Sequence, residues 1–105
     1  MTKEQSMAII ETMVSQLGGN KALAMTGGRF IADTENCKLI FIFKGSRKAN
    51  RLHMTYLEGQ DLYKMEFIKH SPKYLTDKVV KEYDGVYCDQ VIELFEAFTG
   101  LYLSL

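Results

Sequence analysis

The sequence predicts a two-layer α+β domain, because its apolar periodicity changes twice along the chain. Apolar residues recur every three or four positions near both ends, as in helices, and every second position between them, as in strands. The chain has 105 residues and is 47% hydrophobic, which fits a single domain over residues 1–105. We therefore expect an N-terminal helix, an antiparallel meander of three to four strands and a C-terminal helix, with both helices packed on one sheet face.

The first expected element is a helix over residues 3 to about 17. Thr2 is suited to cap its N-terminus, and Gly18 is suited to end it. The spacing of its apolar residues predicts one buried face, which comprises Met7, Ile10, Val14 and Leu17.

Residues 18–28 are expected to connect this helix to the sheet, with a short helical turn at residues 21–25. The segment contains two glycine pairs, one at each end. A phosphate-binding loop would need GxxxxGK[ST] between a strand and a helix. Here the first pair follows a helix and the second precedes a strand. The pair Gly27 and Gly28 is therefore interpreted as the turn into the sheet.

Segments that alternate in hydropathy follow, and they predict the strands. Pro72 should end the last of them, and residues 59–61 fit a hairpin connection. Residues 75–83 fit either a further edge strand or a helical turn. The predicted strand segments are RFIADT, CKLIFIFK, RLHMTYLE and DLYKMEFIK.

The segment CKLIFIFK predicts the most buried strand. Leu39, Phe41 and Phe43 fall on one side of it, and Ile40 and Ile42 fall on the other. A strand with two apolar sides is expected to be central or covered on both faces. The second sheet face is otherwise mostly polar, so these isoleucines mark a candidate contact surface.

The last expected element is a helix from about residue 85 to 98. Asp84 is a candidate N-cap whose charge suits the positive helix end, and Gly100 is placed to end the helix. Its predicted apolar stripe comprises Tyr87, Val91, Leu94, Phe95 and Phe98.

Charge is segregated along the chain, although 13 basic and 13 acidic residues give a net charge of zero. Residues 37–57 contain no acid, and residues 82–105 contain no base. The first candidate binding set is the loop KGSRKANR, with Lys44, Arg47, Lys48 and Arg51. The second is an acidic stripe expected on the last helix, with Asp89, Glu93 and Glu96.

This dipolar surface predicts macromolecular binding. A zero net charge argues against a protein whose whole surface grips nucleic acid. The leading hypothesis is therefore a non-enzymatic protein that binds another macromolecule, most simply a protein. Self-association is included, with the basic hairpin of one copy meeting the acidic helix of another. The alternative is a nucleic-acid-binding module that uses the basic loop at residues 44–51.

No motif in the chain predicts catalysis, a metal site or a cofactor. Cys37 and Cys88 are far apart in sequence and lack zinc-like spacing with His53 and His70. A small enzyme would need a pocket that unites one thiol with a histidine. The longest apolar run, residues 39–43, is too short to span a membrane, and no signal peptide is present. We therefore expect a cytoplasmic protein with reduced cysteines.

Three stretches resemble a family of short proteins encoded by bacteriophages and prophages. They are QLGGNKALAMTGGRF, GQDLYKMEFIK and YDGVYCDQVIELFEAFTGLYLSL. The resemblance runs from about residue 7 to the end and implies work inside a bacterial host cell as a phage accessory protein. It brings no activity and no catalytic residues. Members commonly carry alanine where this chain has Gly28, a difference expected to affect only the turn.

Overall fold

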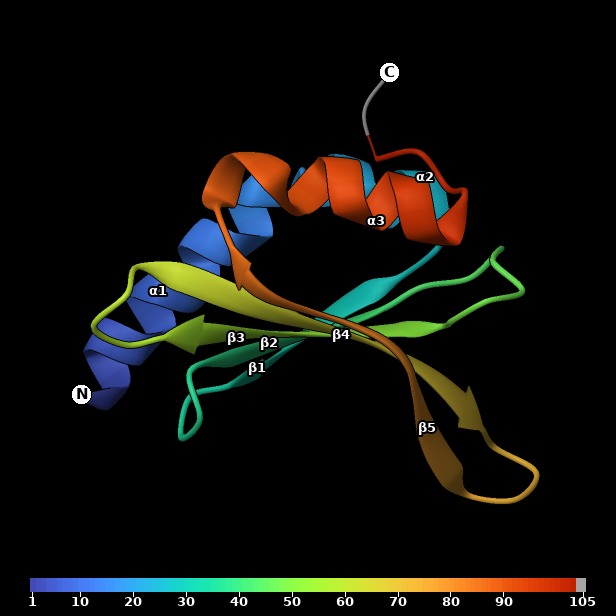
Figure 1. Ribbon diagram of the computed structural model, residues 1–105, viewed down its shortest axis with the longest axis horizontal. Helices are drawn as coiled ribbons and strands as arrows, with labels where there is room; N and C mark the ends of the chain where they lie inside the picture. Colours follow the sequence, from blue (N-terminus) through green and yellow to red (C-terminus); the bar gives the residue numbers. More distant parts are fainter. Residues whose placement is uncertain (104–105) are drawn as a thin grey trace.

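The computed structural model describes residues 1–103, which form a two-layer α+β domain as predicted. All the helices lie on one side of an antiparallel sheet (Figure 1). Ser104 and Leu105, which end the stretch that resembles the phage family, lie outside the described residues. The elements are α1 (Lys3–Gln16), α2 (Asn20–Thr26), β1 (Arg29–Asp33), β2 (Lys38–Ile42), β3 (Arg51–Leu57), β4 (Leu62–Ser71), β5 (Thr76–Val86), the 3-10 turn η1 (Cys88–Gln90) and α3 (Val91–Thr99).

Within residues 1–103 the sheet has five strands in the order β1-β2-β3-β4-β5, and each strand is antiparallel to the next. The meander is thus one strand longer than the upper limit of the prediction. The additional strand is β5, which includes residues 75–83 from Thr76 onward, so that the strand alternative for this segment is correct. As predicted, β4 ends at the residue before Pro72.

Helix α1 begins with the predicted cap. The Thr2 hydroxyl accepts from the Gln5 N–H at 3.1 Å, and the Gln5 side chain accepts from the Thr2 N–H at 2.8 Å. This reciprocal pair satisfies two backbone donors that the helix start leaves free. Gly18 follows the C-cap residue with a φ of +107°, a left-handed conformation that favours glycine.

The buried face of α1 differs from the predicted face. Ser6 and Met13 are buried, whereas Met7 is 38% exposed. The Ser6 hydroxyl donates to the Thr34 carbonyl at 2.7 Å, which fixes the rotation of the helix over the turn between β1 and β2. A side-chain hydrogen bond to a distant carbonyl carries no periodic signal, so that the sequence pattern missed it.

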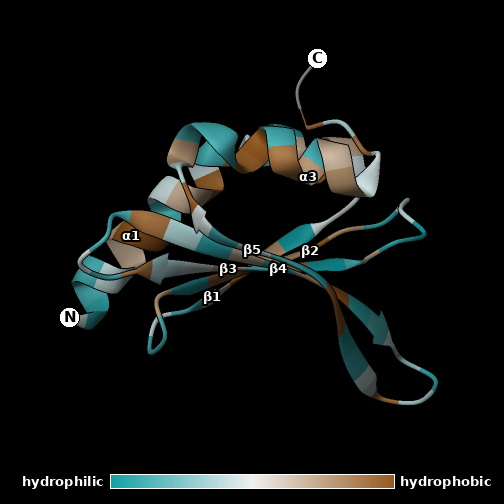
Figure 2. Cartoon of the chain, in the orientation of Figure 1, coloured by the Kyte–Doolittle hydropathy of each residue, from teal (hydrophilic) through white to brown (hydrophobic). Residues whose placement is uncertain are grey.

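The core lies between the sheet and the helices and is built around phenylalanine rings. Phe41, Phe43, Phe67 and Phe95 are almost fully buried, and their ring centroids are 4.9–6.1 Å apart where they meet Phe95. We call these four residues the aromatic cluster. The burial of Phe41 and Phe43 confirms the predicted buried side of β2. Helix α3 covers this side, and most of it is coloured as hydrophobic in Figure 2.

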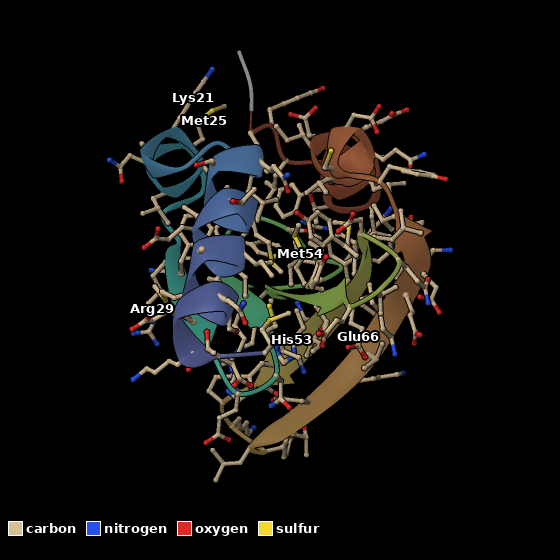
Figure 3. All side chains as sticks on the ribbon, turned by 90° about the vertical axis from the view of Figure 1, so that its left-hand side faces the viewer. Lys21, Met25, Arg29, His53, Met54 and Glu66 are labelled. Atoms are coloured by element: carbon tan, nitrogen blue, oxygen red, sulfur yellow. The ribbon has the colours of Figure 1, made fainter. Side chains whose placement is uncertain are left out.

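The opposite side of the sheet, which we call the open face, carries none of the helices formed by residues 1–103 (Figure 1). Figure 3 shows Met54 between the sheet and the helices, and His53 and Glu66 on the far side. Strand β2 is central as predicted, but its second side is not covered: Ile40 and Ile42 are only half-buried there.

Gly28 lies where the chain turns into β1, and its environment corrects one expectation. A Cβ at this position would lie 2.2 Å from the Ile42 carbonyl oxygen and 2.9 Å from the Phe41 ring. Alanine here would therefore disturb β2 and the core, not only the turn. The reason is the close approach of two backbone segments, which no local pattern reveals.

The start of the last helix also differs from the prediction. Asp84 is a residue of β5, and α3 begins at Val91. Val86 pairs with Tyr63 and is buried, so that the strand continues past the expected cap. Tyr87 is 61% exposed rather than part of the apolar stripe. Gly100 ends the helix in a left-handed conformation, as predicted.

Candidate functional site

The loop between β2 and β3 presents three of the predicted basic residues on a fixed backbone. The Ser46 hydroxyl donates to the Thr99 carbonyl at 3.0 Å, which ties the loop to the end of α3. Ala49 is fully buried below it. Lys44, Arg47 and Lys48 are exposed. Their position also suits the negative C-terminal end of α3.

Hydrogen bonds join this loop to β4. The Asn50 amide donates to the His70 carbonyl and accepts from the His70 N–H, both at 2.8 Å. The Lys69 ammonium donates to the Arg47 carbonyl at 3.2 Å. The loop and the β4–β5 hairpin are therefore held together at one end of the sheet, which is the right-hand end in Figure 1.

The β4–β5 hairpin adds cations that the sequence analysis did not select. Lys69, Lys73 and Lys78 are exposed on it. At its turn, Tyr74 is 68% exposed, and the Lys73 ammonium lies 5.4 Å from the centre of its ring. We call Lys44, Arg47, Lys48 and Arg51 together with Lys69, Lys73 and Lys78 the basic end. The sequence does indicate that this hairpin is basic, because residues 67–81 contain a single acid, Asp77.

That acid is paired. A nitrogen of the His70 ring lies 2.5 Å from the Asp77 carboxylate. This hydrogen bond lowers the pKa of Asp77 below its ordinary value, and the charge of Arg51 acts in the same direction. Asp77 is therefore held as a carboxylate, and it is the one negative charge that the sequence places within residues 67–81.

Exposed acids gather at the opposite end of the strands. Glu35 lies in the turn after β1, Glu58 and Asp61 lie in the turn after β3, and Asp84 lies near the end of β5. These turns are on the left in Figure 1, beside the N-terminus. The predicted dipole is therefore directed along the strands, from the acidic turns to the basic end.

The acidic stripe expected on the last helix is only partly present. Asp89 lies in the 3-10 turn η1 rather than on α3, while Glu93 is exposed in the first turn of α3. Glu96 is half-buried, and its carboxylate accepts from the Leu103 N–H at 2.8 Å. Glu96 therefore has a structural role, because it holds the segment that follows α3.

The cysteines and histidines are not brought together. Cys37 is buried on the helix side of the sheet, where its thiol lies 3.9 Å from the Ser6 carbonyl oxygen. Cys88 is exposed in η1, which leads into α3. His53 and His70 lie on the open face, where His70 pairs with Asp77. Among residues 1–103, no group of His, Cys, Asp or Glu is placed to hold a metal ion.

Two shallow hollows lie beside the ends of the sheet. One, of about 420 Å³, is lined by residues of α1 together with Tyr56 and Glu58. The other, of about 350 Å³, lies beside the basic end and is lined by Gly27, Gly28, Arg29, Ile42 and Lys44. Neither lining contains a cysteine or a histidine.

His53 occupies the middle of the open face, between Ile40 and Glu66 on the neighbouring strands. Burial lowers its pKa below the ordinary value of 6.5, and Lys38 and Arg51 act in the same direction. The carboxylates of Glu66 and Asp77 oppose this effect without cancelling it. The folded protein therefore holds His53 in its neutral form more strongly than the unfolded chain does.

This lowered pKa predicts a loss of stability in mild acid. As the pH falls through about 6.5, His53 takes up a proton more readily in the unfolded chain than in the folded protein, which lowers the free energy of unfolding. Above that pH His53 is neutral in both states, and this loss is absent. We expect a lower melting temperature at about pH 5.5 than at about pH 7.5, and a smaller difference in His53→Gln. Asp33 and Asp77 do not contribute in this window, because their pKa values are lowered from 3.8. An unchanged difference in His53→Gln would contradict the assignment.

Comparison of the chain with protein-family models, curated proteins and solved structures finds no match. The resemblance to short phage proteins therefore stays a prediction. Among residues 1–103, no helix is long and apolar enough to cross a membrane.

Proposed function

We propose that this protein binds nucleic acid through its basic end and is not an enzyme. The observation that carries the proposal is the meeting of two segments, the loop at residues 44–51 and the β4–β5 hairpin, at the same end of the sheet. Both bear exposed lysine or arginine, and the one acid between them is paired with His70. Because of this arrangement, we now propose nucleic acid as the first candidate partner and a protein as the second.

The physical basis is phosphate neutralisation. Cations fixed on two projecting segments displace the counterions that surround a nucleic-acid backbone, which supplies affinity without reading sequence. Two-stranded β-ribbons also fit nucleic-acid grooves. Tyr74, exposed at the turn of the hairpin beside Lys73, offers a ring on which an unpaired base can stack. Charge segregation allows this binding although the net charge is zero.

A protein partner is the second candidate, and the open face favours it. Ile31 is 41% exposed there, beside the half-buried Ile40 and Ile42. An exposed apolar patch of this kind marks a protein contact more often than a nucleic-acid contact. In either case we retain, as a proposal, a phage accessory protein that works in the cytoplasm of a bacterial host.

Charge reversal in the basic end tests the proposal. We expect fluorescence anisotropy with labelled single- and double-stranded DNA and RNA to show binding that weakens steeply between about 50 and 200 mM salt. The double variant Arg47→Glu/Lys48→Glu should lose most of this affinity, because two cations become two like charges facing phosphate.

Lys3 provides the matched control, because it is exposed on the first turn of α1 near the acidic turns. Arg47→Glu and Lys3→Glu change the net charge equally, so that a larger loss for Arg47→Glu assigns binding to the basic end. Equal losses of affinity in the two variants would show that the overall charge of the protein, and not the basic end, determines binding. No binding to any of these nucleic acids at low salt would rule the proposal out.

A further inference from the structure

Among residues 1–103, strand β1 forms one edge of the sheet, and some of its backbone hydrogen-bonding groups have no partner strand. On β2, the Phe43 N–H donates to the Asn50 carbonyl, so that odd-numbered residues of β2 bond toward β3. Even-numbered residues of β2 therefore bond toward β1, and their register partners on β1 are the odd-numbered residues. Phe30 and Ala32 are left with their N–H and C=O groups directed away from the sheet.

The other edge is protected against strand pairing, whereas the middle of β1 is not. Strand β5 carries Lys78 and Lys81, and two register shifts interrupt its pairing with β4. Lysines and bulges are common devices that prevent an edge from extending. The central residues of β1 are Phe30, Ile31 and Ala32, without a charge or a proline.

We propose that β1 pairs antiparallel with β1 of a second copy of this chain, about a twofold axis at Ile31. This register sets Phe30 of each copy opposite Ala32 of the other, so that the outward N–H and C=O groups of both copies are satisfied. It also sets Arg29 of each copy opposite Asp33 of the other. The two sheets then form one continuous sheet.

Charge and hydropathy both fit this register. The Arg29 side chain has no hydrogen bond or ion pair with any residue among 1–103, and Figure 3 shows it at the outer edge of the molecule. Asp33 is held as a carboxylate, because its hydrogen bonds to Asn36 lower its pKa. On the open face, Ile31 meets its own copy and extends the apolar row that includes Ile40.

The same geometry aligns the molecular dipoles. Antiparallel pairing of β1 places the basic end of one copy beside the acidic turns of the other. Self-association of this kind goes beyond the proposed nucleic-acid binding and does not depend on it. It also differs from the contact expected from the sequence, in which the basic loop met the last helix.

Disulfide trapping tests the register directly. A residue at the twofold axis of this pairing faces its own copy at a Cα distance of about 4.5 Å, within the range that a disulfide spans. In a Cys88→Ser background, Ile31→Cys should form a linked dimer almost completely under mild oxidation. Ala32→Cys is the matched control, because the two copies of residue 32 are offset along the strand to about 8 Å.

Charge exchange tests the same contact without cysteine. Light scattering should show the mass of the unmodified chain rising toward that of a dimer with concentration. Arg29→Glu should weaken the dimer about tenfold or more, and Arg29→Glu/Asp33→Lys should restore it, because the pairs become complementary again. A strict monomer, equal linking at residues 31 and 32, or no restoration in the double variant would overturn the proposal.

Discussion

Phe95→Ala is expected to lower the free energy of unfolding by about 3–5 kcal/mol, the largest single loss that we predict. Phe95 is fully buried on α3, and its ring meets those of Phe41, Phe43 and Phe67. Truncation removes the transfer free energy of the ring and leaves a cavity between two layers. The surrounding rings lie on β2, directly after β2 and on β4, and both strands are paired within the sheet, so that the rings have little freedom to close the cavity.

Urea unfolding followed by circular dichroism measures this loss. A domain of this size has a total stability of about 5–15 kcal/mol, so that Phe95→Ala is close to the limit of folding. Phe95→Leu keeps part of the volume and should lose less, which provides a folded variant for the comparison. Tyr102→Ala is the aromatic control: Tyr102 is 65% exposed, and its truncation should change stability by no more than about 0.5 kcal/mol. A loss below about 1 kcal/mol for Phe95→Ala would contradict the central place of this ring.

The sequence predicted this core well, because the relevant pattern is local. Phe41 and Phe43 alternate with isoleucines over a few residues, and that alternation determines which side of β2 faces the helices. The cap at Thr2 and the helix end at Gly100 were also predictable, because both depend on residues within one turn of the helix.

Strand β5 could not be assigned from the sequence, because most of its side chains are exposed on both sides. Only Val80, Tyr83, Gly85 and Val86 are even partly buried among its residues. Its extended conformation depends on backbone hydrogen bonds to β4, and these require no alternation of apolar and polar side chains along β5. The same pairing overrode the local cap signal of Asp84, since Val86 still belongs to the sheet.

The candidate site was predictable only in part for the same reason. Lys44, Arg47 and Lys48 follow directly from the absence of acids in their segment. The lysines of the β4–β5 hairpin become neighbours of that loop only if β5 is a strand. Glu96 looked like a free acid because its partner, the Leu103 N–H, lies beyond the end of the helix.

Gly28→Ala is expected to lower the free energy of unfolding by about 3 kcal/mol, at the upper end of the range for overpacking. The added Cβ would lie 2.2 Å from the Ile42 carbonyl oxygen and 3.0 Å from the Thr26 hydroxyl. The first of these atoms is backbone in β2, and the second is held by a 2.7 Å hydrogen bond to Ala22. Neither can yield as the end of a flexible side chain would, so that β1 and β2 must separate.

Gly27→Ala separates this steric effect from backbone conformation. Gly27 has a φ of +63°, but the nearest atom to an added Cβ is 4.0 Å away, on the Lys44 side chain. The strain of a left-handed alanine is about 1–2 kcal/mol. We therefore expect Gly28→Ala to lower the free energy of unfolding more than Gly27→Ala does. Amide hydrogen exchange in β1 should become faster in Gly28→Ala alone. A smaller loss at Gly28 than at Gly27 would contradict the close approach to β2.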